Sequence, residues 1–113
     1  MLSCFNLAPG KSAADFEARL APYVAELQAL DLVVDALPVG ERRTDTILDT
    51  DEERSHRYFM IMRFRDKAQS DASVAHIEAG SEPCGRLHRH AYAVVRDPVF
   101  ICWEVDDEGS PCG

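Results

Sequence analysis

The chain has 113 residues and a formal net charge of −8, with 46% hydrophobic and 28% charged residues. This length predicts one globular domain, and the hydrophobic fraction is ordinary for a domain with a single core. The negative charge argues against a nucleic-acid partner, and no apolar run approaches the roughly 20 residues that would cross a membrane. We therefore expect one soluble domain over residues 1–106 and a polar tail over residues 107–113.

The four cysteines include no C-x-x-C pair and no zinc-finger spacing, so we predict no metal site. Cys4 and Cys102 lie in apolar runs, where a reduced cysteine behaves as a small hydrophobe. The residues that follow Met1 have the pattern of a short strand and not that of a signal peptide. Together these features predict a cytoplasmic protein with reduced thiols.

The first half of the chain predicts a strand, a helix and a second strand. Residues 1–7 alternate as a strand, and Ser12 with Asp15 forms a variant capping box that opens a helix. Pro22 lies inside this helix and is expected to kink it without ending it. The apolar stripe of the helix recurs at helical spacing: Phe16, Leu20, Val24 and Leu27.

Residues 32–39 predict an edge strand, because Asp35 interrupts the apolar run and Pro38 cannot donate to a ladder. The acidic stretch 40–56 predicts a solvated loop, in which residues 46–48 are a candidate extension of the sheet. Its acidic cluster lacks the glycine and the final glutamate of a calcium loop.

The most apolar strand is predicted over residues 57–65, and both of its faces are apolar. Asp66 is expected to cap a helix over 67–79, which Gly80 ends. The alanines of this helix form a ridge that suits close packing: Ala68, Ala72, Ala75 and Ala79. A short helix or turn through Arg89 and a last strand over 99–105 complete the chain.

The element order β-α-β-β-α-β predicts an α+β, ferredoxin-like fold with a four-stranded antiparallel sheet and two helices on one face. The first and third strands should be central. Two helices cover only one face of such a sheet, so the apolar residues of the other face need a second cover. We expect that cover to be a second copy of the chain, which predicts a homodimer.

With this order and the run FRDKAQSDASVAHIEA over residues 64–79, the chain resembles the dimeric α/β-barrel superfamily. That group includes antibiotic-biosynthesis-type monooxygenases and stress-responsive α/β-barrel proteins. The resemblance implies a sheet-to-sheet homodimer with a pocket between the sheet and the helices. In the heme-degrading branch an Asn on the first strand lies near bound oxygen and a His on the second helix ligates heme iron. Asn6 and His76 match these two positions. The tryptophan of that branch is missing, since Phe64-Arg65-Asp66 stand in its place and the only tryptophan is Trp103.

Asn6 and His76 are therefore the candidate catalytic residues. Tyr58, Arg63 and Trp103 are candidate substrate-binding residues, because polar groups on apolar strands can orient a planar organic molecule in an apolar pocket. The alternative is that each satisfies its own hydrogen bond at the margin of the sheet. Cys84 and His88 lie four apart but lack a third metal ligand, so a surface cluster is favoured.

These patterns lead to three functional hypotheses. The first is a small-molecule-binding homodimer of unassigned chemistry, with no predicted cofactor and with neither nucleic acid nor membrane as a partner. The second is an enzyme, namely a cofactor-independent monooxygenase acting on an aromatic or polycyclic molecule, or a heme-degrading enzyme with heme as cofactor. The third is a structural or stress-associated dimer without a ligand.

Overall fold

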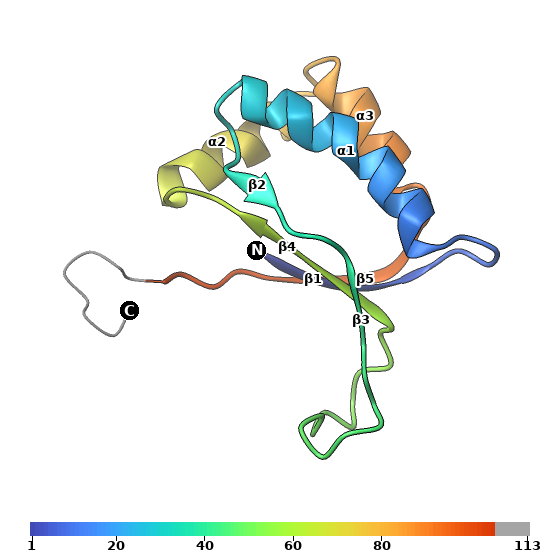
Figure 1. The fold of residues 1–113 in the computed structure, drawn as a ribbon. Coiled ribbons are helices and arrows are strands. Elements are labelled where there is room, and N and C mark those ends of the chain that lie inside the picture. Colours follow the sequence, from blue (N-terminus) through green and yellow to red (C-terminus); the bar gives the residue numbers. More distant parts are fainter. Residues whose placement is uncertain (106–113) are drawn as a thin grey trace.

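The computed structural model describes residues 1–105 and shows an α+β fold, a five-stranded antiparallel sheet with three helices in that range (Figure 1). Its elements are β1 Leu2–Leu7, α1 Ala13–Ala29, β2 Asp35–Ala36, β3 Gly40–Glu41, β4 Tyr58–Arg63, α2 Lys67–Glu78, α3 Cys84–Tyr92 and β5 Val95–Ile101. The predicted tail 107–113 lies outside the described residues. None of the helices described here is long and apolar enough to cross a membrane.

The strands are ordered β2-β4-β1-β5, and β3 also pairs with β4. The predicted central strands are therefore β1 and β4, which is confirmed, and the edge position of β2 is confirmed as well. All described pairs are antiparallel. This order is consistent with a ferredoxin-like fold, but the predicted four strands and two helices are wrong in number, because the edge strand is split into β2 and β3 and the short piece α3 is a full helix.

The three helices lie on the same side of the sheet, as Figure 1 shows. The core lies between the two layers, where Phe5 of β1 and Met60 of β4 meet the buried face of α1. Phe16 is fully buried there, with its ring centroid 5.1 Å from that of Phe5 and 5.9 Å from that of Tyr92 on α3. The buried face of α1 consists of Phe16, Leu20, Tyr23 and Leu27.

The predicted helix caps are confirmed. The Ser12 amide donates to the Asp15 carboxylate at 2.8 Å, and the Asp15 amide donates to the Ser12 hydroxyl at 3.2 Å. α1 stays continuous through Pro22. The Asp66 carboxylate accepts from the Gln69 amide at 2.8 Å.

The edge strand is shorter than predicted. Within residues 32–39 only Asp35–Ala36 form a strand, and Gly40–Glu41 form β3 on the same edge of β4. Pro38 lies between them and has no N–H to donate. The candidate extension at residues 46–48 is wrong, because these residues form a turn in the loop.

The last strand begins earlier than predicted, at Val95, and ends at Ile101 instead of residue 105. Asp97, with φ 53°, and Pro98 lie inside it, and the pairing with β1 shifts register between Cys4 and Asn6. β5 is an edge strand, so a bulge and a proline are tolerated there. The short helix also exceeds its prediction, because α3 continues to Tyr92 instead of ending at Arg89.

The alanine ridge of α2 is exposed, so it does not pack closely on a neighbouring element within residues 1–105. α2 instead buries Gln69 and Ser73. The Gln69 side chain accepts from the Arg65 amide at 2.6 Å and donates to the Asp31 carbonyl at 3.1 Å. The helix is therefore attached to the end of α1 by polar contacts.

The buried hydroxyls Ser3 and Ser73 should respond oppositely to replacement. Ser3 is 1% exposed, and its Oγ has no hydrogen-bond partner within residues 1–105. The Ser73 hydroxyl donates to the Leu32 carbonyl. We expect Ser3→Ala to raise the free energy of unfolding by about 1 kcal/mol and Ser73→Ala to lower it by about 1 kcal/mol. Urea denaturation measures both, and a loss on Ser3→Ala as large as that on Ser73→Ala would contradict this expectation.

Candidate functional site

The side of the sheet that faces away from the helices is apolar across three strands. Leu2 of β1 is paired with Ile61 and Ile101, and Cys4 is paired with Phe59 and Val99. We call these six residues the open face. Phe59 is 38% exposed and Val99 is 36% exposed, and the other four are partly buried. The Phe59 ring covers Gly40, where a Cβ atom would lie 2.1 Å from the ring.

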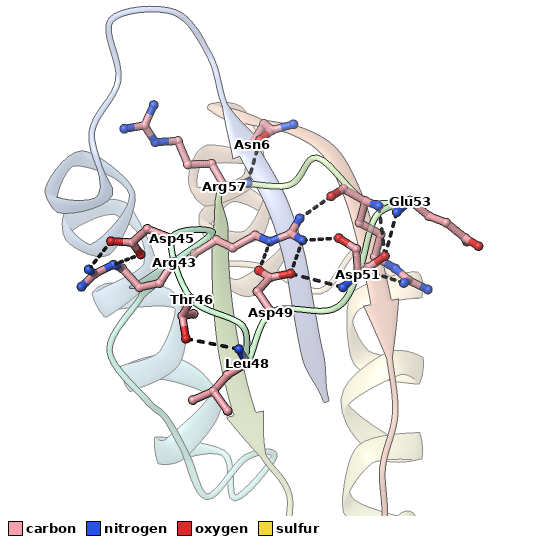
Figure 2. Close-up of polar contacts among 11 residues, drawn as sticks. Asn6, Arg43, Asp45, Thr46, Leu48, Asp49, Asp51, Glu53 and Arg57 are labelled. Carbon is pink, nitrogen blue, oxygen red and sulfur yellow. Dashed lines mark hydrogen bonds and ion pairs between the residues drawn. The ribbon is translucent and has the colours of Figure 1, made fainter.

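Residues 42–56, which we call the arm, project from the sheet on the side away from the helices (Figure 1). Arg42 fixes the shape of the arm. Its guanidinium donates to the two carboxylate oxygens of Asp49 at 2.6 and 2.7 Å. It also donates to the carbonyl oxygens of Asp51, at 2.7 Å, and Arg54 (contacts drawn in Figure 2). The long acidic loop is thus held by one arginine.

The acidic groups of the arm are largely paired. The Arg42 guanidinium holds the pKa of the Asp49 carboxyl below its ordinary value. The Arg54 side chain, 2.7 Å from the Asp51 carboxylate, and the amide of Glu53 lower the pKa of Asp51 to about 2. Both carboxylates are therefore charged at neutral pH, and each has an arginine beside it.

A cavity of about 360 Å³ lies between the arm and the open face. Its apolar lining comes from Cys4, Tyr58, Phe59 and Leu48. Its polar lining comes from Arg42, Asp49, Thr50, Asp51, Arg54 and His56. The volume falls in the range of small-molecule sites. The resemblance implies a pocket between the sheet and the helices, but core side chains fill that space. The cavity lies on the other side of the sheet.

A second hollow of about 550 Å³ adjoins the first, with which it shares Arg42, Asp51, Arg54 and His56. Glu41, Thr44, Ser55 and Arg57 complete its lining. Because this lining is polar or charged, the first cavity is the better candidate for an organic ligand.

His56 lines both hollows and was not predicted as a site residue. Its Nε2 lies 2.7 Å from the Asp97 carbonyl oxygen. A carbonyl only accepts, so Nε2 donates the proton in this contact. Nδ1 is buried and has no partner within the part of the chain described. The only sequence signal for His56 is its position just before the central strand.

Asn6 and His76 are not brought together by any described contact. The Asn6 Oδ1 accepts from the Arg57 amide at 3.0 Å, and its Nδ2 lies 3.4 Å from the Asp97 carboxylate. Asn6 therefore joins β1 to β5, through Asp97, and to Arg57, the residue before β4 (the contact with Arg57 is drawn in Figure 2). His76 lies in the last turn of α2, in the helical layer. Neither residue lines the cavity.

Of the three predicted substrate-binding residues, one lines the cavity. Tyr58 does so, and its ring is stacked 6.0 Å from that of Phe5. Arg63 lies at the opposite end of β4, where its guanidinium donates to the two carboxylate oxygens of Asp35 at 2.7 and 2.5 Å. Trp103 lies beyond β5 and is 74% exposed. The three residues therefore do not converge on one ligand.

Cys84 and His88 do not form the predicted surface cluster. Cys84 is fully buried, and the half-buried His88 ring lies 5.4 Å from Tyr23 and 4.9 Å from Tyr92. Burial lowers the pKa of His88. Within residues 1–105 no group of three or more metal-ligating side chains is placed to hold an ion.

Comparison with known proteins finds no matching family model, no matching curated protein and no matching solved structure. The features of the structure that point to a function are therefore the cavity, the arm and the open face.

Arg42→Gln is expected to loosen the arm. The substitution removes the charged contact to Asp49 and the bonds to two carbonyl groups, so the arm backbone should open more often. We expect amide hydrogen exchange over residues 43–56 to rise about tenfold, with β1 and β4 unchanged. The matched control is Arg43→Gln, which removes only an exposed pair with Asp45. Equal exchange in the two variants, measured by mass spectrometry, would refute the role of Arg42.

Proposed function

We propose that this protein is a small-molecule-binding homodimer of the dimeric α/β-barrel type. In this proposal two copies pair through their open faces, and the ligand lies in the cavity between that face and the arm. The observation that carries the proposal is the position of the cavity, because its apolar floor belongs to the face that the helices leave uncovered.

The dimer is supported by the composition of the open face. Leu2, Ile61 and Ile101 form one apolar row across three strands, and Cys4, Phe59 and Val99 form the next. Burying apolar surface stabilises by roughly 25 cal/mol per Å². A twofold pair of identical faces would bury both rows at once. Two such sheets would then lie between two outer helical layers.

The lining of the cavity supports a neutral, planar organic ligand. Phe59 of the open face offers aromatic surface, and the charged side chains of the wall are already paired with one another. A charged ligand would have to displace one of these ion pairs. We propose no catalytic activity, because the side chains of Asn6 and Arg63 already make structural hydrogen bonds.

The first test is a native mass spectrum of freshly purified protein. We expect a dimer that retains additional mass, and the mass would begin to identify the ligand. A protein that is monomeric at every concentration would contradict the dimer.

The second test titrates the neutral fluorescent probe 2-naphthol and follows its anisotropy. We expect saturable binding that Thr50→Trp weakens at least about tenfold, because Thr50 lines the cavity and the indole would fill it. The matched control Thr44→Trp places the same ring in the second hollow and should leave binding unchanged. If no retained mass and no saturable binding are found, the ligand-binding proposal fails.

A further inference from the structure

We propose that the tip of the arm, Ile47 and Leu48, clasps the partner subunit at residues 101–105, at the end of the sheet opposite to its own arm. This inference rests on the proposed homodimer. The clasp specifies which surfaces of the two copies meet and how the copies are oriented relative to each other.

The tip is apolar, exposed and ordered. Ile47 is 93% exposed and Leu48 is 87% exposed. The Leu48 amide donates to the Thr46 hydroxyl at 3.2 Å, and the base of the arm is held by Arg42 (Figure 2). Two adjacent aliphatic side chains on such a structured projection favour a docking contact. The net charge of −8 argues against an anionic membrane surface as the occupant.

The arm stands on the side from which a second copy would approach. Leu48 lines the same cavity as Cys4 and Phe59 of the open face. Figure 1 shows the arm and the helices on opposite sides of the sheet. A copy that packs on the open face must therefore lie beside the arm.

Another exposed apolar group lies at the other end of the sheet. The arm leads into β4 at Tyr58, whereas Ile101 pairs with Leu2 at the far end of β1. Residues 102–105 continue beyond β5, with Trp103 74% and Val105 76% exposed. In Figure 1 this segment and the arm extend from opposite ends of the sheet.

Twofold symmetry decides which of these groups can meet. If the axis runs between the two sheets and along the strands, each arm lies beside the arm of the partner subunit. If the axis runs across the strands, each arm lies over the opposite end of the partner's sheet, beside residues 101–105. Only the second arrangement covers both the tip and residues 101–105, and it is isologous and closed.

The small size of the open face favours a further contact. Three strands about 4.8 Å apart, each contributing about five residues at roughly 3.4 Å, cover only about 250 Å². A stable interface buries about 800 Å² on each partner. The arm and residues 101–105 are the exposed apolar surfaces of the chain placed to supply much of the difference.

The first test replaces both tip residues, Ile47→Ser with Leu48→Ser. We expect the dimer dissociation constant, measured by sedimentation over a dilution series, to rise at least about tenfold, because each interface loses four aliphatic contacts. The control is Val74→Ser, a 56% exposed position on α2 in the helical layer, which should leave the constant unchanged. An unchanged constant in the double variant would overturn the clasp.

The second test maps the contact directly. Leu48→Cys is made together with Cys4→Ala and Cys112→Ser, so that Cys102 is the remaining exposed native thiol and Cys84 is buried. On mild oxidation we expect a disulfide between position 48 and Cys102 of the partner subunit, identified by peptide mass spectrometry. A link between the two copies of position 48, or no link in a dimeric sample, would overturn the inference. A wild-type protein that is always monomeric would instead remove the proposed dimer and the clasp together.

Discussion

Ile61→Asp is expected to convert the proposed homodimer into a monomer. Ile61 pairs with Leu2 in the first apolar row of the open face. In the proposed dimer each copy would bury a carboxylate without a partner, and the uncompensated desolvation of a buried charge costs about 3–5 kcal/mol. Because the dimer contains two such carboxylates, its dissociation constant should rise by at least about a thousandfold. Light scattering after size exclusion, with sedimentation at several concentrations, measures the change.

The matched control is Val74→Asp, which adds the same charge to the exposed surface of α2. It should leave the dimer intact. Circular dichroism of both variants checks that the fold is kept, which we expect because position 61 faces away from the helices. If Ile61→Asp dissociates no more readily than Val74→Asp, the open face is not the interface.

Phe16→Ala is expected to cause a larger loss of folding stability than the other substitutions described above. Phe16 is fully buried, and it joins β1 through Phe5 and α3 through Tyr92. Removing a buried phenylalanine ring costs about 3–5 kcal/mol, through lost burial and the cavity that remains. Since small domains have only about 5–15 kcal/mol of stability in total, the variant should be close to unfolding at moderate urea concentration.

Phe100→Ala is the control for this substitution. Phe100 lies on β5, is 50% exposed and touches the same Tyr92 at a centroid distance of 6.3 Å. Its removal should lower the free energy of unfolding by about 1 kcal/mol, since surface replacements rarely cost more. Equal losses in the two variants would mean that Phe16 does not hold the layers together.

Features set by neighbouring residues could be predicted from the sequence. Ser12 with Asp15, Asp66 and Gly80 mark helix ends through contacts within a few residues, and these signals are reliable. The central position of β4 followed from its apolar residues on both faces. The bounds of β5 could not be predicted in this way, because Asp97-Pro98 is accommodated by a bulge in the pairing with β1.

The site was predicted less completely than the fold. Tyr58 was identified as a pocket residue, but Arg42 and His56 were missed. Arg42 contacts residues 49–54, and His56 contacts Asp97, so both roles depend on how a loop without periodicity folds back. Asn6 and His76 were predicted as catalytic residues from a resemblance in the order of elements. Such a resemblance gives positions along the chain but not the directions of side chains.

The bonds that Arg42 makes have a consequence for how such a chain can evolve or be redesigned. They close a ring within the arm, since the arginine precedes the tip and its acceptors follow it. Insertions or replacements between residues 43 and 48 therefore leave the strand pairing of β4 untouched. In the proposed dimer the arm would then be a replaceable segment, in which changes alter the ligand cavity and the tip while the sheet and helices stay the same.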